Sequence, residues 1–153
     1  MKRLFCGALV CLLLLSGCGA PGSAAVTAFD PEETTQAVLD SGAFSEQLEK
    51  LDPDLIALLF GLPGDPTQYE GSALYYSTGA TSEAAAVIHV SDKSQTASVE
   101  SALEQWVELQ IEATRNYQPA EVEKLEHAIL ETREDTVLLV VAADWETAEK
   151  AIP

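Results

Sequence analysis

Four glutamates recur at every fourth position in one stretch of this sequence, and they form its most regular set of titratable side chains. They are Glu100, Glu104, Glu108 and Glu112. On an α-helix this spacing places all four on one face, opposite an apolar face that carries Trp106. Like charges four residues apart weaken a helix by about 0.2–0.5 kcal/mol per pair, so local stability does not explain the pattern. The face is therefore either a solvated surface or a binding stripe for a cation or a basic partner.

A second set of candidate binding residues is aromatic. Tyr69, Tyr75 and Tyr76 lie close together after a loop rich in glycine and proline, and Tyr117 follows later. A tyrosine presents a flat apolar ring with a hydroxyl group at its tip, which suits a groove for a carbohydrate or a peptide. The alternative is that these tyrosines only pack at sheet and loop edges. The sequence leaves both interpretations open.

Metal and catalytic chemistry have little support in the residue pattern. His89 and His127 each have an acid nearby, Asp92 and Glu126 respectively. A site of two histidines and a carboxylate would require two hairpins to bring them together, whereas an isolated strand histidine more often acts as a hydrogen-bonding side chain. The sequence contains no Gly-x-Ser-x-Gly motif and no Gly-Lys-Ser/Thr phosphate loop. We therefore predict that the protein is not an enzyme and has no metal site and no cofactor.

The first eighteen residues predict export and attachment to a membrane. A basic head precedes an apolar run over residues 4–15, and Leu15-Ser16-Gly17-Cys18 resembles the bacterial lipobox. The run is too short to span a hydrocarbon core of about 30 Å, but it fits a cleavable signal peptide. We expect cleavage between Gly17 and Cys18 and diacylglycerol on the Cys18 thiol, whose two acyl chains give stable anchoring. The alternative is an ordinary signal peptide in which Cys18 is incidental.

This interpretation divides the chain into three parts. Residues 1–17 are the signal peptide, residues 18–29 are the lipidated cysteine with a flexible tether, and residues 30–153 are a single domain. Cys6 and Cys11 leave with the signal, so the exported domain is expected to have no free thiol and no disulfide. The predicted location is the extracytoplasmic face of the cell membrane.

The charge balance limits the partners. The sequence has 25 acidic and 8 basic residues, a formal net charge of −17. Loss of Lys2 and Arg3 with the signal leaves 6 bases against the same 25 acids, a net charge of −19. Nucleic acid is a poor partner for such a surface, because phosphate binding depends on lysine and arginine. Anionic lipid headgroups are disfavoured for the same reason, so membrane contact is expected through the lipid on Cys18.

Hydrophobic patterning and capping residues predict an α+β domain. Helices are expected over residues 31–40, 53–60, 93–116, 120–126 and 145–151, with a further short helical piece over 45–51, and the expected N-caps are Asp30, Asp92 and Asp144. Strands are expected over residues 72–77, 84–90, 127–132 and 136–142, and the run 137–141 is typical of a central strand buried on both faces. The expected fold has two layers: an antiparallel four-stranded sheet of two hairpins, with helices packed on one face, in the order ααββαββα.

Several short motifs recur together, in the same order, in one group of proteins. They are the lipobox, Asp54-Leu55-Ile56 with Phe60-Gly61-Leu62, Ala86-Val87-Ile88 leading to Asp92, Tyr117-Gln118-Pro119, and the run 137–141. In these segments the sequence resembles the uncharacterised bacterial lipoproteins of domain-of-unknown-function family 4358, over roughly residues 31–152. The resemblance implies no catalytic residues. One departure is the second hairpin turn, Arg133-Glu134-Asp135, where a glycine would be more usual.

Taken together, these features favour a non-enzymatic interaction module that is held at the membrane by lipid and binds another envelope protein. The alternative is a lipoprotein that binds a small solute or a cation through the glutamate face or the tyrosine-bearing loop. The first hypothesis predicts a protein partner, and the second predicts stabilisation by a ligand.

Overall fold

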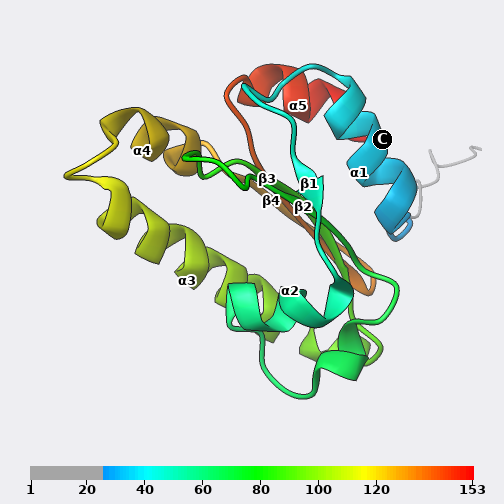
Figure 1. Ribbon diagram of the computed structural model, residues 1–153. Helices are drawn as coiled ribbons and strands as arrows, with labels where there is room; N and C mark the ends of the chain where they lie inside the picture. The colour runs from blue at the N-terminus through cyan, green and yellow to red at the C-terminus, as the bar shows by residue number, and fades with distance from the viewer. Residues whose placement is uncertain (1–25) are drawn as a thin grey trace, which may run out of the picture.

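The computed structural model describes residues 26–153, so the predicted lipobox with Gly17 and Cys18 lies outside the described residues (Figure 1). The helices are α1 (Pro31–Asp40), α2 (Pro53–Phe60), α3 (Thr96–Thr114), α4 (Pro119–Glu126) and α5 (Trp145–Ala151), with short 3-10 helices at Pro66–Tyr69 and Lys93–Gln95. The strands are β1 (Glu49–Lys50), β2 (Ala73–Tyr76), β3 (Ala84–His89), β4 (Ile129–Arg133) and β5 (Thr136–Val141). The α+β class is confirmed.

Aspartates begin the helices much as expected. The Asp30 carboxylate accepts the N–H of Glu33 at 2.9 Å and begins α1, and Asp144 accepts the N–H of Thr147 at 3.0 Å and begins α5. Asp92 accepts the N–H of Ser94, so it caps the 3-10 helix that leads into α3 rather than α3 itself.

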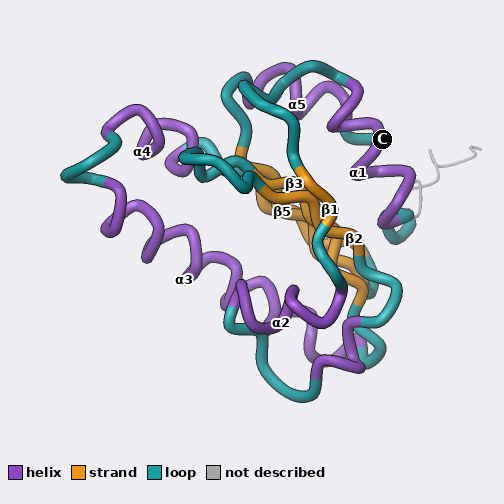
Figure 2. Tube along the Cα trace, in the orientation of Figure 1, coloured by secondary structure: helices purple, strands orange, loops and turns teal. Residues whose placement is uncertain are grey.

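The sheet is antiparallel throughout and has five strands in the order β1-β2-β3-β5-β4. Figure 2 shows these strands, in orange, between the helices. Four of them are the expected strands, and β1 is the addition. The helical piece expected over residues 45–51 is wrong, because residues 45–48 are irregular and Glu49–Lys50 form β1, which pairs with β2. The backbone of this segment is held by tertiary contacts: the N–H of Ser45 donates to the Glu83 carboxylate, and the N–H of Leu51 donates to the carbonyl of Leu74.

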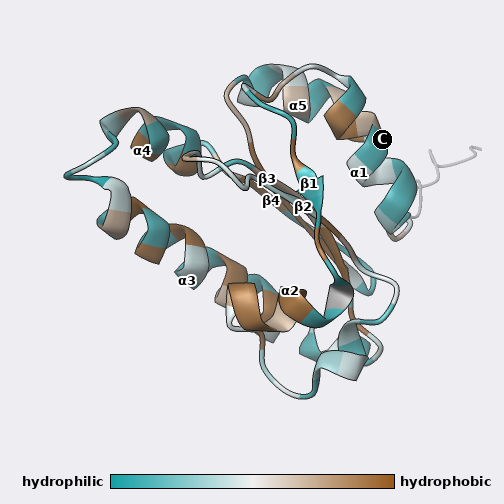
Figure 3. Ribbon diagram, in the orientation of Figure 1, coloured by the Kyte–Doolittle hydropathy of each residue, from teal (hydrophilic) through white to brown (hydrophobic). Residues whose placement is uncertain are grey.

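Helices cover both faces of this sheet, so the expected packing on one face is wrong (Figure 1). Alternate side chains of a strand point to opposite faces, and all six residues of β5 are buried. Val137 and Leu139 belong to the core beneath α2, α3 and α4, whereas Leu138 and Val140 belong to the core beneath α1 and α5. Figure 3 shows the resulting hydrophobic centre between two helical layers. A central strand with two apolar faces requires this third layer.

The second hairpin turn stores strain that a single substitution should release. Glu134 has a φ of 52°, in the left-handed region that is unfavourable for a residue with a Cβ. We expect Glu134→Gly to raise the free energy of unfolding by about 0.5–1 kcal/mol, because the relief exceeds the entropy that glycine loses on folding. Denaturant unfolding would measure the change. Glu134→Ala is the control, since it removes the exposed ion pair with Lys93 but keeps the Cβ. Equal stabilities for the two variants would contradict the strain.

Candidate functional site

Glu100, Glu104, Glu108 and Glu112, which we call the glutamate ladder, all lie on α3. Two of them line a cleft of about 570 Å³ between α3, α4 and the start of β4. We call it the acidic cleft. Its lining residues are Glu104, Val107, Glu108, Ile111, Leu125, Glu126, Ala128 and Leu130. α3 and α4 are joined by a short turn and lie next to each other at one edge of the molecule (Figure 1). Residues of both helices line the cleft.

The floor of the acidic cleft is apolar. Val107 and Ile111 lie one turn apart on α3, Leu125 comes from the last turn of α4, and Ala128 and Leu130 come from the chain that enters β4. Leu125 is buried in the core beneath α3, and the other four are half-buried and pack against that core. The floor is therefore a continuation of the hydrophobic core that reaches the surface.

The rim of the acidic cleft is negatively charged. Glu104, Glu108 and Glu126 are exposed, and none of them forms an ion pair within residues 26–153. Five of the six basic side chains in this part of the chain pair with other acids, and the sixth, Arg115, follows the end of α3. The rim thus holds three carboxylates without a cation beside an apolar floor. This combination suits a ligand that has both apolar and cationic groups.

The glutamate ladder is therefore split by the structure. Glu104 and Glu108 line the acidic cleft, while Glu100 and Glu112 lie on the same helix outside its lining. Glu126, which completes the rim, was considered in the sequence only as an acid beside His127 and not as part of a binding surface. The signal for it was weak, because it stands alone beside Leu125 at the end of a short helix and belongs to no periodic pattern.

The candidate tyrosines do not share a groove. Tyr69 is buried, and its hydroxyl donates to the carbonyl of Pro63. Tyr75 and Tyr76 are neighbours in β2 and so face opposite sides of the sheet, with Tyr76 packed in the core beneath α3. Tyr117 is exposed in the turn between α3 and α4. Burial raises the pKa of the Tyr69 and Tyr76 hydroxyls, which is consistent with packing roles.

The two histidines also lie apart. His89 ends β3 and lies near the turn between β4 and β5. Its Nδ1 atom is 3.0 Å from the carbonyl oxygen of Glu70, and its Nε2 atom is 3.8 Å from the Asp135 carboxylate in that turn. His127 precedes β4 at the opposite end of this hairpin and stacks on Trp145, with 3.8 Å between ring centroids. Among residues 26–153 no group of three histidine, cysteine or acidic side chains is placed to hold a metal ion.

A buried ion cluster fixes the position of α4. It consists of Glu83, Glu121 and Lys124: the Lys124 Nζ atom is 3.1 Å from Glu83 and 3.0 Å from Glu121. The Glu83 side chain is fully buried and also accepts the N–H of Ser45, and Glu121 accepts the N–H of Ser82 at 2.8 Å. The cluster therefore joins α4, which forms one wall of the acidic cleft, to the start of β3 and to the segment before β1.

The charge state of Lys124 follows from these contacts. Burial alone would lower the pKa of its ammonium group, but hydrogen bonds to Glu121 and Glu83 and the charges of these carboxylates together raise that pKa. A raised pKa in the folded protein means that the protonated cluster contributes its stability at neutral pH and loses it only in strongly alkaline solution. Sequence patterns did not reveal the cluster, because its members lie 38 residues or more apart along the chain, apart from the Glu121–Lys124 pair.

Comparison with known proteins identifies the family. The family model described as "Domain of unknown function (DUF4358)" matches residues 40–142, which covers most of the chain and both walls of the acidic cleft. The match confirms the family resemblance over a shorter range than expected, since it omits α5 and nearly all of α1. Neither a curated protein nor a solved structure matches the chain. Among the described helices, none combines the length and the apolar character needed to cross a membrane.

Proposed function

The chain belongs to the DUF4358 family, and we propose that it is a non-enzymatic interaction module, tethered by lipid to the extracytoplasmic face of the membrane. In this proposal the acidic cleft binds a basic, amphipathic segment of a partner protein. The observation that carries it is the set of three carboxylates, Glu104, Glu108 and Glu126, which stand without a cation around an apolar floor.

The entry point of the chain supports this arrangement. Phe29 is buried in the core beneath α1 and α5, its N–H donates to the Thr136 hydroxyl at 3.0 Å, and the Arg133 guanidinium lies 4.0 Å from its ring centroid. A tether from Cys18 would therefore join the layer of α1 and α5, whereas the acidic cleft belongs to the layer on the other face of the sheet. Attachment at Cys18 would leave the cleft open to a partner.

The chemistry of the cleft favours a basic protein segment over other partners. The protein is strongly acidic, which disfavours nucleic acid and anionic lipid headgroups. An amphipathic helix can place apolar side chains on the floor while its lysine or arginine groups reach the rim. Such side chains combine an apolar stem with a charged head, which matches the order of floor and rim in the acidic cleft.

A further apolar surface lies on the other side of α3. Leu58 of α2 is 79% exposed and Leu109 of α3 is 56% exposed, and both line a shallow pocket of about 270 Å³ beside Trp106. Scattered exposed leucines are common, but these two come from different helices and line the same pocket. Leu109 directly follows Glu108 on α3. A partner segment that extends from the acidic cleft across α3 would therefore also contact Leu58 and Leu109.

Zero-length crosslinking tests the proposal directly. A carbodiimide couples a carboxylate to a lysine amine without a spacer, so it reports direct contact between an acid of this protein and a lysine of the partner. Applied to intact envelopes, it is expected to join Glu104, Glu108 or Glu126 to lysines of one partner protein, as read by mass spectrometry. Glu100 and Glu112 are internal controls on the same helix. Crosslinks spread evenly over all exposed acids would contradict the proposal.

A further inference from the structure

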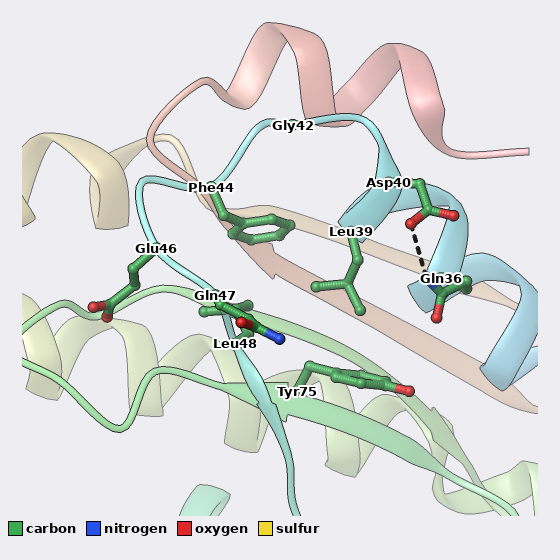
Figure 4. A pocket seen from close by; sticks show the side chains of 9 residues that line it. All are labelled: Gln36, Leu39, Asp40, Gly42, Phe44, Glu46, Gln47, Leu48 and Tyr75. Atoms are coloured by element: carbon green, nitrogen blue, oxygen red, sulfur yellow. Dashed lines mark hydrogen bonds between the residues drawn. The ribbon is translucent and has the colours of Figure 1, made fainter.

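A separate pocket of about 350 Å³ lies between α1, the segment before β1 and strand β2, on the face of the sheet opposite the acidic cleft (Figure 4). The residues that matter for its chemistry are Gln36, Leu39, Asp40, Phe44, Gln47 and Tyr75. Ligand pockets usually measure from about 300 Å³ upwards, so this one has the size for a small ring and not for a large molecule.

The walls of this pocket are flat and apolar. Figure 4 shows the Tyr75 ring along one side, with Phe44 and Leu39 across from it. All three side chains are half-buried, so their faces are accessible to a ligand. A flat aromatic surface stacks favourably on the C–H face of another ring.

Polar groups of mixed type surround these walls. Gln36 and Asp40 lie one turn apart on α1, and the Gln36 amide donates to the Asp40 carboxylate at 2.8 Å. This bond leaves the second Asp40 oxygen as an acceptor and the Gln36 amide with one further donor and its carbonyl. The Gln47 amide stands on another side of the pocket and offers both a donor and an acceptor (Figure 4). Paired donors and acceptors match hydroxyl groups, each of which donates and accepts.

Two neighbouring groups of opposite charge disfavour a charged ligand. The Lys50 ammonium lies 5.8 Å from the Tyr75 ring centroid, which disfavours a second cation there, and the Asp40 carboxylate disfavours an anion. Glu46 also borders the pocket, but its carboxylate points away and accepts hydrogen bonds from Ser77 and Thr81, which lower its pKa. A neutral ligand rich in hydroxyl groups fits these surroundings best.

We propose that this pocket binds one ring of a carbohydrate. The apolar face of the sugar ring stacks on Tyr75, and its hydroxyl groups bond to Gln36, Asp40 and Gln47. This pocket shares no lining residue with the acidic cleft. The test of carbohydrate binding is therefore independent of the test for a protein partner. A single sugar ring offers few atoms for contact, so the dissociation constant is expected in the millimolar range.

Saturation-transfer NMR on the full-length protein in lipid nanodiscs tests this inference. The probes are the methyl glycosides of glucose, galactose, mannose and N-acetylglucosamine, and a β-1,4-linked trimer of N-acetylglucosamine. We expect saturation of ring C–H protons for at least one probe. Binding of the trimer at least as tight as that of its monomer would assign the site to a glycan chain, and tighter binding of a monomer would assign it to a free sugar.

Sugar binding by three variants distinguishes binding in this pocket from nonspecific binding elsewhere on the protein. Tyr75→Ala is expected to weaken binding about tenfold or more, through lost stacking. Gln47→Ala changes an exposed side chain and is expected to weaken binding without disturbing the fold, which keeps the test valid if Tyr75→Ala unfolds the protein. Tyr117→Ala, an exposed tyrosine far along the chain, is the control and should bind as the unchanged protein does. No binding by any probe, or binding that survives both Tyr75→Ala and Gln47→Ala, would overturn the inference.

Discussion

Replacing Lys124 by methionine is expected to lower the free energy of unfolding by about 3–5 kcal/mol. The methionine keeps most of the apolar volume but removes the cation that pairs with Glu83 and Glu121. Glu83 is fully buried, so its charge would remain in the interior with only the backbone N–H of Ser45 as a partner. Denaturant unfolding monitored by circular dichroism measures the loss.

Two further variants show whether the loss comes from the buried charge. Lys150→Met is the matched control, because Lys150 is an exposed lysine whose pair with Glu146 spans 4.0 Å, and its loss should lie within about 0.5 kcal/mol. Combining Lys124→Met with Glu83→Gln should restore part of the stability, since the amide can still accept the Ser45 N–H without a charge. A Lys124→Met variant as stable as Lys150→Met would show that the buried ion cluster does not hold α4.

The second large effect concerns the membrane tether. Substitution of Cys18 by alanine is expected to abolish incorporation of a labelled fatty acid and to leave residues 1–17 attached, because the lipobox is processed at its lipidated cysteine. Metabolic labelling and the mass of the intact protein measure these two results. Cys11→Ala is the control, since Cys11 lies inside the predicted signal peptide and its loss should change neither. Fatty-acid label that persists in the Cys18→Ala variant would contradict the predicted anchor.

Local sequence signals predicted most elements of this fold. Asp30 and Asp144 mark the starts of α1 and α5 because a carboxylate can accept the free N–H groups of a first helical turn. The four strands expected from the sequence are all present, because their β-branched or aromatic residues and their flanking turns act within a few residues. The non-helical path of residues 45–51 and the short strand β1 within it were missed, because this path is held by a bond from Ser45 to Glu83, far away in the sequence.

The predicted burial of one strand on both faces already conflicted with the prediction of helices on one face of the sheet only. Residues 137–141 were expected to be buried on both faces, and they are. A strand buried on both faces requires cover on both faces, so helices on one side only could not have satisfied it. The first and last helices, α1 and α5, provide the second cover through Val38 and Ala148.

The candidate site was predicted only in part. Helical periodicity placed Glu104 and Glu108 on one surface, since that pattern depends on neighbours in sequence. It did not indicate that α4 and β4 would bring Leu125, Glu126 and Leu130 beside them, because this contact depends on how the chain turns after α3. The tyrosine set failed for a similar reason: adjacent residues of a strand point to opposite faces, so Tyr75 and Tyr76 were never able to share a groove.

The central claim is that the acidic cleft, and not the overall negative charge, binds a basic segment. It is tested most directly by two double variants of α3 that change the net charge equally. Glu104→Lys with Glu108→Lys reverses charges in the cleft, and Glu100→Lys with Glu112→Lys reverses charges of the same ladder outside it.

The probe is a synthetic amphipathic peptide of leucine and lysine, with a leucine–glutamate peptide as its negative control, and fluorescence anisotropy measures the dissociation constant. The cleft variant is expected to bind the basic peptide about tenfold more weakly or worse, while the other variant stays within about threefold of the unchanged protein. Equal weakening in both variants would show that the peptide responds only to net charge and would contradict the proposed site.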